Sequence, residues 1–384
     1  MTGLFWTGGL NEGFALNAEV GFYDTTLRDG EQTVGVVLSP EDKLELARGL
    51  DELGIARIEA GFPRVSEDDR RAVELISRAD LNAEIWGFSR AVPADVEALV
   101  ELGVGASVIE SPISDLKLRA LGVSREKMLE RITDAIANAV EHGIRVAFFG
   151  VDSTRAEPDY YAEVYRAAVQ AGAREVVVVD TIGIATPEAA EFLVRQTREW
   201  VGDVPVHWHG HNDFGLATAC SLAAVKGGAR WLQGTINGMG ERAGNANLPE
   251  VALALRGLYG VETNLRLERV RAFSERLREL SGYELEPFKP FVGENLFTRE
   301  SGAVASQFHD PPAIEPYSSE VVAAERRIVL GKKSGLDSIR IKAEELGLEL
   351  DEEAQRELLA RVKELGTRKR RLVTDEEFLA LARG

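Results

Sequence analysis

A carboxylate and two histidines, far apart in the chain, have the side-chain types and the spacing of ligands for one divalent metal ion. They are Asp29, in DTTLRDGEQ (24–32), and His209 with His211, in HWHGHND (207–213). If the second segment is a strand, residues two apart project to the same side and can chelate one ion. Such an ion would polarise a carbonyl group, and these ligands suit Mg²⁺, Mn²⁺ or Zn²⁺, and equally a non-haem Fe(II) site. A hydrogen-bonded polar pair is the alternative for the two histidines alone.

Composition narrows the classes of partner. The chain has 384 residues, 45% of them hydrophobic, which is enough for one large domain and a smaller one. A net charge of −18 would repel nucleic acid and anionic membranes, so small metabolites are the expected partners. No apolar run approaches the roughly 18 residues that span a bilayer, and the N-terminus lacks a secretion-signal pattern. Because Cys220 is the only cysteine, an internal disulfide is excluded. We expect a cytoplasmic protein that binds neither nucleic acid nor membrane.

Eight short β-rich segments alternate with helical patterns along most of the chain. These strand candidates are 20–24, 56–60, 83–88, 106–111, 145–150, 175–180, 204–211 and 231–236. Between them, Ser39 before Pro40 and Thr186 before Pro187 each place an N-cap residue ahead of a proline at the first helical position. Eight βα units in a row predict an α/β fold of the (β/α)₈ TIM barrel type, with an open parallel sheet as the alternative.

The barrel prediction bears on the metal hypothesis, because such barrels place their functional groups at the C-terminal ends of the strands. Asp29 follows the first strand, His209 and His211 end the seventh, and the loop 238–245 follows the eighth. The first, seventh and eighth strands become neighbours when the barrel closes. The fold therefore brings these elements to one sector and favours a metal site over a polar pair.

The chain divides into three predicted regions. They are an N-terminal lead (1–18), the catalytic barrel (19–261) and a C-terminal region (262–384) that combines a mixed lid with a helical tail subdomain. The segment 289–320 is too long and too specific in composition for a passive linker. We expect it to cover the barrel mouth or to dock on a partner subunit.

Six motifs resemble the 2-isopropylmalate/homocitrate/citramalate synthase family. They are FYDTTLRDGEQ (22–32), IEAGFP (58–63), DTIGIATP (180–187), HGHNDFGLA (209–217), TINGMGERAGN (235–245) and VLGKKSG (329–335). Enzymes of this family are metal-dependent barrels that condense an acyl-CoA, usually acetyl-CoA, with a 2-oxo acid. The resemblance implies a divalent metal as cofactor, acetyl-CoA as co-substrate, a 2-oxo acid as substrate and a homodimer.

The same resemblance implies roles for residues near the triad of Asp29, His209 and His211. Asn245 would complete or support the metal site. Arg28 would bind the keto oxygen, where a guanidinium and a metal together stabilise the developing alkoxide.

Thr181 would hydrogen-bond the carboxylate of the 2-oxo acid. The alternatives are that Arg28 is only an ion-pair partner and that Thr181 only caps a strand end. Gly240 and Gly244 are candidate cofactor-binding positions, although glycines in this pattern are a weak dinucleotide signal away from a first βα turn.

Two cationic residues are candidates for recognising the substrate. Arg90, after the third strand, could meet an acid group of the substrate. Lys117, in SPISDLKLRAL (111–121), replaces a histidine of the family and could recognise an additional anionic group. A solvated lysine at a helix start is the alternative for Lys117.

The groups that should transfer protons depart from the family pattern. Val151 in FGVDSTR and Val304 in ESGAV stand where the resemblance leads us to expect a glutamate and a histidine. Since valine cannot transfer a proton, Asp152, His309 and Tyr317 are the nearest catalytic candidates. The alternative for His309 is a surface loop histidine.

We therefore expect a metal-dependent acyltransferase that joins acetyl-CoA to a 2-oxo acid and forms a 2-hydroxy-2-alkyl dicarboxylate, with a shifted substrate range. One alternative is a C–C bond lyase or aldolase on the same metal platform. Another is a catalytically silent paralogue that binds a metabolite. The intact triad and Arg28 argue against the silent paralogue, whereas Val151 and Val304 argue for it.

Overall fold

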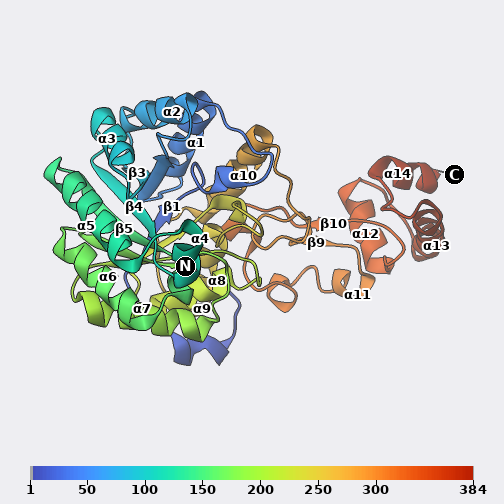
Figure 1. Ribbon diagram of the computed structural model, residues 1–384. Coiled ribbons are helices and arrows are strands. Elements are labelled where there is room, and N and C mark those ends of the chain that lie inside the picture. Colours follow the sequence, from blue (N-terminus) through green and yellow to red (C-terminus); the bar gives the residue numbers. More distant parts are fainter. Residues whose placement is uncertain (1–2, 384) are drawn as a thin grey trace. The chain divides into compact units, whose positions relative to one another are not determined.

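Eight parallel strands close into a barrel (Figure 1). The structure is a computed structural model and describes residues 3–383. The strands are β1 (Gly21–Asp24), β2 (Arg57–Gly61), β3 (Glu84–Arg90), β4 (Ala106–Pro112), β5 (Arg145–Val151), β6 (Glu175–Asp180), β7 (Val206–Gly210) and β8 (Trp231–Gly234). Each strand pairs with the next, and β8 pairs with β1 from Trp231 opposite Gly21 to Gly234 opposite Asp24. This closure confirms the predicted (β/α)₈ barrel and excludes the open sheet.

Helices alternate with the strands and cover the outside of the barrel (Figure 1). They are α1 (Pro40–Glu52), α2 (Glu67–Ser77), α3 (Pro93–Leu102), α4 (Asp115–Leu121), α5 (Arg125–Glu141), α6 (Pro158–Gln170), α7 (Pro187–Val201), α8 (Ala217–Gly227), α9 (Leu248–Tyr259) and α10 (Leu267–Ser281). The hydroxyl of Ser39 accepts a hydrogen bond from Asp42 N at 3.1 Å, and that of Thr186 accepts one from Ala189 N at 3.2 Å. Both predicted helix starts are therefore capped.

Short 3₁₀ helices lie in the loops after three of the strands. They are η2 (Gly30–Gln32) after β1, η3 (Ser153–Arg155) after β5 and η4 (Ile236–Gly238) after β8.

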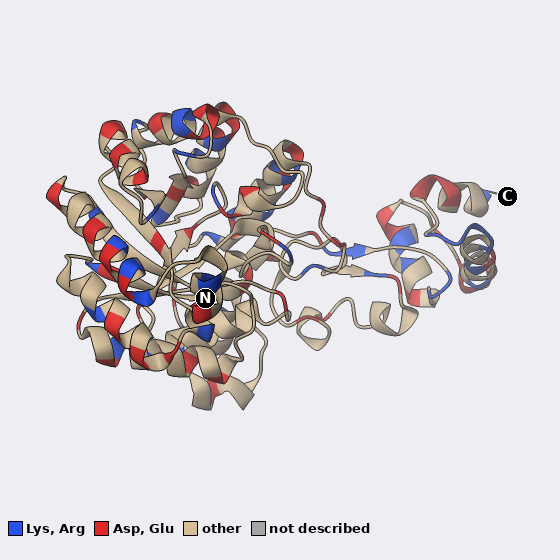
Figure 2. Cartoon of the chain, viewed as in Figure 1, with Lys and Arg blue, Asp and Glu red and all other residues tan. Residues whose placement is uncertain are grey.

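Figure 2 shows acidic residues on many of the outer helices, interspersed with basic ones. Acidic and basic side chains are thus mixed over the outer helices, in a chain with a net charge of −18.

Aromatic and aliphatic side chains from alternate strand positions fill the barrel interior. This buried cluster consists of Tyr23, Trp86, Phe88, Ala106, Val108, Ala147, Phe149, Val177 and Val179, and Val151 packs against it. Side chains alternate along a strand, so Glu110, two residues beyond Val108, faces the same interior. Glu110 and Val151 therefore lie near the C-terminal end of the barrel interior.

A buried ion network occupies the N-terminal end of the barrel. Arg57 donates two hydrogen bonds to the Glu175 carboxylate, at 2.6 and 3.0 Å, and His207 Nε2 lies 2.7 Å from the same carboxylate. The Arg57 guanidinium also stacks 3.7 Å from the ring centroid of Trp231. These groups bind one another, so their positions are explained by packing and charge pairing.

The chain forms two compact units. The barrel unit is Asn11–Glu284, and the tail unit joins the N-terminal segment through Leu10 to the chain from Leu285 onward. The sequence analysis placed the end of the barrel at residue 261, whereas the barrel unit also includes α10. Ser274 on this helix donates a hydrogen bond to Asn237 Oδ1 at 2.6 Å, and Phe273 packs on Gly49.

The tail unit has its own strand pair, helices and core. It contains β9 (Thr298–Arg299) and β10 (Arg327–Ile328), which pair in parallel, and the helices α11 (Gly302–Ala305), α12 (Leu336–Glu345), α13 (Glu352–Lys369) and α14 (Asp375–Arg383). Ile339, Val362 and Phe378 lie in the centre of its apolar core. Within the described residues, no helix combines the length and apolar composition needed to cross a membrane.

Candidate metal and substrate site

The structure brings Asp29, His209 and His211 together at the C-terminal end of the barrel. Asp29 lies at the start of η2, after β1, and its backbone N–H donates to Thr25 O at 2.9 Å. The Nε2 atoms of His209 and His211 are 3.4 Å apart, and Asp29 Oδ2 lies 3.4 and 3.9 Å from them. Because side chains alternate along β7, both imidazoles face the same point as the Asp29 carboxylate, as predicted.

This arrangement fits a single divalent ion. Ligand atoms that surround one ion at about 2.1 Å are about 3.0 to 3.4 Å from one another, so the three atoms need to move little. All three residues are buried, with 2%, 1% and 7% of Asp29, His209 and His211 exposed. Among the described residues, Asp29 Oδ1 and the neighbouring Asn245 Oδ1 are also buried without a hydrogen-bond partner. Buried polar atoms are nearly always paired, so these oxygens fit a site that binds a cation.

The charge states of the triad suit metal binding. Burial lowers the pKa of His209 to about 3 and also holds the pKa of His211 below its ordinary value, so both imidazoles are neutral at pH 7. Burial opposes ionisation of Asp29, but the charge of Arg28, with the Asn245 amide, outweighs it and lowers the Asp29 pKa. One anionic and two neutral ligands are the forms that coordinate a divalent ion.

A glycine-containing loop after β8 positions Asn245. His211 and Asn245 form an antiparallel bridge, and Asn245 Nδ2 donates to Met239 O at 3.0 Å. Gly240 has φ +151°, and a Cβ there would lie 2.3 Å from Asn245 Nδ2. At Gly244, with φ +82°, a Cβ would lie 1.9 Å from Gly238 O. Both glycines therefore permit the tight loop, and their contact with a cofactor stays a prediction.

Arg28 is held beside the triad by a fully buried glutamate that the sequence analysis did not single out. Glu59 on β2 accepts hydrogen bonds from Tyr23 Oη at 2.6 Å, Thr25 Oγ1 at 2.8 Å and Arg28 Nε at 2.5 Å. Arg28 Nη1 lies 3.1 Å from Asp29 Oδ2. Arg28 Nη2 is buried and has no hydrogen-bond partner within residues 3–383. The guanidinium is thus fixed on one edge and has an N–H donor left for a ligand.

Thr181 lies at the end of β6, next to the turn that contains Asp152. Thr181 Oγ1 accepts a hydrogen bond from Asp152 N at 2.7 Å, which leaves the hydroxyl proton for another acceptor. The Asp152 carboxylate accepts two hydrogen bonds from Arg155, both at 2.8 Å, and another from Ser114. Asp152 is therefore engaged in holding its turn, where its own φ is +68°. A proton-transfer role for Asp152 would require this ion pair to open.

Two family profiles match the chain. That of the HMGL-like family covers residues 19–277, and that of the homocitrate synthase post-HMGL domain-like family covers residues 291–370. The chain belongs to the HMGL-like family. Its two matched regions lie within the barrel unit and the tail unit, respectively.

Curated relatives of this HMGL-like chain are named as synthases. It is 46% identical to a homocitrate synthase of Methanopyrus kandleri, with 95% of this chain and 92% of the relative covered. It is 41% identical to a 2-isopropylmalate synthase and 39% identical to an (R)-citramalate synthase, both of Methanocaldococcus jannaschii, with 94% and 95% of this chain and 70% and 74% of the relatives covered. The resemblance that the motifs indicated is confirmed.

Solved HMG-CoA lyases share the barrel fold. The Brucella melitensis enzyme aligns with a TM-score of 0.61 at 22% identity, over 69% of this chain and all of that chain. The Pseudomonas aeruginosa enzyme aligns with a TM-score of 0.63 at 23% identity, over 70% of this chain and 95% of that chain. This likeness supports the fold alone.

Charged residues surround the ends of β3 and β4 in the HMGL-like barrel. Arg90 forms an ion pair with buried Asp95 at 2.7 Å, and 53% of the Arg90 side chain is exposed. Lys117 lies half-buried on α4. Between them, Glu110 on β4 faces the interior, and the sequence analysis missed it. The apolar positions at 106 and 108 are the signal that could have revealed Glu110, since they share its strand face.

His309 and Tyr317 belong to the tail unit of this HMGL-like chain. His309 is exposed. The ring of Tyr317 contacts those of Phe297 and Phe5, with centroids 5.8 and 6.1 Å away. Their catalytic roles stay predictions.

A cavity of about 300 Å³ lies beside Arg28, at the ends of β1 to β3. Its lining consists of Arg28, Glu31, Gln32, Phe62, Val65, Asp69 and Phe88. Buried Lys43 binds Glu31 Oε2 at 2.5 Å and Asp69 Oδ1 at 2.7 Å, and so neutralises part of this wall. The cavity is therefore next to the guanidinium that has a donor available.

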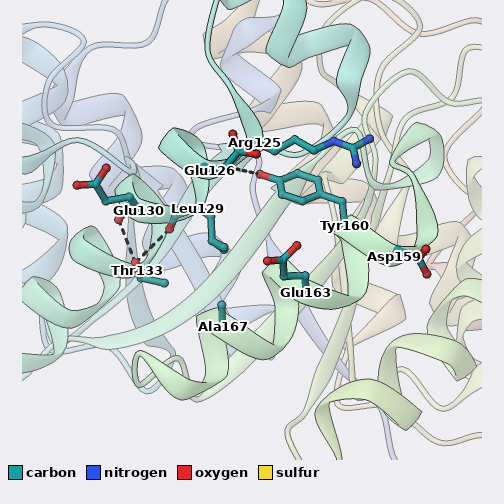
Figure 3. A pocket seen from close by; sticks show the side chains of 9 residues that line it. All are labelled: Arg125, Glu126, Leu129, Glu130, Thr133, Asp159, Tyr160, Glu163 and Ala167. Carbon is teal, nitrogen blue, oxygen red and sulfur yellow. Dashed lines mark hydrogen bonds between the residues drawn. The ribbon is translucent and has the colours of Figure 1, made fainter.

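A larger groove of about 590 Å³ lies on the outside of the barrel, between α5 and α6 (Figure 3). Figure 3 shows acidic side chains from both helices along it, among them Glu126, Glu130 and Glu163. It shares no lining residue with the triad or with Arg28. The groove is thus separate from the candidate site.

Proposed function

We propose that the chain is a divalent-metal-dependent acyltransferase that condenses acetyl-CoA with a 2-oxo acid. The observation that carries the proposal is the buried triad with Arg28 beside it, which forms an electrophilic centre for a keto oxygen. The names of the relatives, over 95% of this chain for the homocitrate synthase, support the same reaction class.

The electrophilic half of the reaction follows from the contacts of the chain. Asp29, His209 and His211 would hold the ion, with Asn245 beside them, and a bound divalent ion supplies Lewis-acid polarisation of the 2-oxo group. Arg28 is fixed by Glu59 and directs its remaining N–H donor to the oxygen on which negative charge develops. Because Arg28 is held before the substrate binds, little reorganisation is needed in the transition state.

Thr181 has a hydroxyl proton available for the carboxylate of the 2-oxo acid. Arg242 Nη2 donates to Thr181 O at 2.6 Å and binds the Asp213 carboxylate, so the loops after β6, β7 and β8 are tied together. This contact fixes the backbone from which the Thr181 hydroxyl projects. Arg90 and Lys117 are our candidates for binding a distal acid group of the substrate.

Coverage of the chain favours a synthase over a lyase. The lyases of Brucella melitensis and Pseudomonas aeruginosa align with 69% and 70% of this chain, whereas the synthase relatives extend through the tail unit. We also propose that the protein is a homodimer, in which the tail unit contributes to assembly.

The test is CoA release from acetyl-CoA in the presence of pyruvate, 2-oxoisovalerate or 2-oxoglutarate, with the product identified by mass spectrometry. We expect release that depends on one of these acceptors and a product that contains the acetyl carbons. A parallel incubation with 3-hydroxy-3-methylglutaryl-CoA tests the lyase alternative. Cleavage of this thioester without acceptor-dependent CoA release would contradict the proposal.

A further inference from the structure

Glu110 occupies a position at which a base could reach the reacting atoms. On β4, Ala106 and Val108 belong to the interior cluster, whereas Ser111 faces outward and donates to Met128 Sδ on α5 at 3.0 Å. Glu110 is two residues beyond Val108 and shares its strand face. Its side chain therefore extends from the last interior layer toward the barrel mouth. In the register of the sheet, Glu110 lies between Arg90 on β3 and Phe149 on β5.

The carboxylate of Glu110 differs from the others at this end of the barrel in having no bound partner. Three buried carboxylates at this end accept hydrogen bonds: Glu59 from three side chains, Asp152 from Arg155 and Ser114, and Asp180 from Thr154, Ile184 N and Ala185 N. Within residues 3–383, no hydrogen bond or ion pair of the Glu110 carboxylate is observed. Its lone pairs are therefore available to a ligand.

The charged groups that face Glu110 come from four elements. Burial raises its pKa, while Arg28 after β1, Arg90 on β3 and Lys117 on α4 oppose this rise and Asp95 on α3 adds to it. The net result is a pKa above the ordinary value of a glutamate. A carboxylate whose pKa is moved toward neutrality is a more effective general base at physiological pH.

Val151 on β5 offers no proton-accepting group to the C-terminal end of the barrel. Val151 packs against the interior cluster and shares a strand face with Ala147 and Phe149. The side chain of β5 nearest the barrel mouth on this face is therefore apolar. Asp152, the next residue, is engaged by Arg155 and Ser114. In the barrel unit, this leaves Glu110 as the interior carboxylate that can accept a proton without breaking an existing contact.

We propose that Glu110 is the catalytic base that removes a proton from the methyl group of the acetyl thioester. This inference rests on the proposed condensation. The Glu110 carboxylate takes one methyl proton, and the C–H electron pair becomes that of the enolate.

The enolate carbon then forms the new C–C bond to C2 of the 2-oxo acid, and the carbonyl π pair moves onto the oxygen beside Arg28. The proton on Glu110 returns to that oxygen, directly or through water, which regenerates the carboxylate. Hydrolysis by one water molecule cleaves the thioester and yields the CoA thiol, a second carboxylate and a proton.

The test uses Glu110→Gln, which preserves size but cannot take up the proton, and Glu110→Asp, which keeps the base one methylene shorter. The full-length variants are assayed with acetyl-CoA and the acceptor that the wild-type protein uses. Glu97→Gln, at an exposed position on α3, is the matched control. Thermal unfolding and Mn²⁺ affinity are measured for each variant, so that a loss of fold or of the metal site is recognised.

We expect Glu110→Gln to lower kcat by at least about 100-fold with little change in KM, as for loss of a general base. Glu110→Asp should retain intermediate activity with a larger deuterium isotope effect from [²H₃]acetyl-CoA than the wild type, because proton removal becomes slower. A merely structural role would not enlarge this isotope effect.

A kcat for folded Glu110→Gln within threefold of wild type would overturn the inference and leave the condensation intact. So would an unchanged isotope effect in Glu110→Asp, or an increase in KM alone, which would assign Glu110 to substrate binding. If the wild-type protein releases CoA with none of the three acceptors, the proposed function fails and this role fails with it.

Discussion

At the scale of single residues, two buried carboxylates at the end of β1 and just after it differ in what their oxygens contact, and these contacts set their charge. Asp29 is kept ionised by the charge of Arg28 and by the Asn245 amide. Asp24 lies at the end of β1, where its oxygens accept hydrogen bonds from Thr26 N and Thr26 Oγ1. Burial raises the pKa of Asp24 to about 7, against the hydrogen bonds from Thr26 that lower it. Two aspartates five residues apart therefore have opposite pKa shifts.

This shift predicts a pH dependence of stability. Unfolded Asp24 ionises near its ordinary pKa, whereas the folded residue stays protonated until about pH 7, so unfolding releases a proton between about pH 4 and 7. The free energy of unfolding of the wild type should fall by on the order of 4 kcal/mol over this range, relative to Asp24→Asn, and level off above it. Urea unfolding at a series of pH values measures the difference. Parallel curves for the two proteins would contradict the assignment.

Sequence reasoning located the triad because the residue types, the His-x-His spacing and the strand order all agree. It missed Glu110 and Glu59 because their importance depends on side chains that meet across the barrel. A motif does not reveal that Glu59 binds Tyr23, Thr25 and Arg28 at once. Asp152 is a candidate because it follows Val151 in the sequence. The sequence does not reveal that its carboxylate pairs with Arg155.

At the scale of elements, the loops after β1, β7 and β8 carry the candidate metal site, and their glycines determine how closely they pack. Gly244 O accepts from Asn212 N at 2.9 Å, and Asn245 N donates to Gly238 O at 3.1 Å. These contacts join the loop after β8 to the one after β7. The orientation of Asn245 thus depends on a backbone path that only glycine can follow.

Gly244→Ala should weaken metal binding without direct contact with the metal. The new Cβ would meet Gly238 O and displace Asn245, so Mn²⁺ affinity should fall by about tenfold or more, as when supporting groups of a metal site are removed. Isothermal titration with Mn²⁺ measures it. Gly103→Ala is the control, because Gly103 has φ +68° but nothing lies within 4 Å of a Cβ there. Equal Mn²⁺ affinities in Gly244→Ala and Gly103→Ala would contradict this prediction. They would show that the contact of the new Cβ with Gly238 O does not affect the metal site.

The elements themselves could be predicted from the sequence. All eight strands were located, since each is a short apolar run between helix-capping or glycine signals, and β1 and β8 close the barrel as expected. The end of the barrel unit was harder to place. The β/α alternation stops before α10, yet Phe273 and Ser274 pack this helix onto the barrel through contacts that the alternation does not encode.

At the scale of the whole molecule, the barrel unit contains the triad, Arg28, Thr181 and Glu110, and the tail unit contains His309 and Tyr317. The residues of the candidate electrophilic site thus lie within one compact unit. This separation predicts that the metal-dependent part of the chemistry depends on the barrel residues alone.

The most direct test is CoA release by the full-length protein after removal of metal with a chelator, measured with and without added Mn²⁺. We predict that stripping abolishes release, that Mn²⁺ restores it in the wild type and in the exposed-site control Asp203→Asn, and that the same Mn²⁺ concentration does not restore it in Asp29→Asn. Full CoA release by the stripped wild type, or restoration of Asp29→Asn to the wild-type rate, would contradict the account.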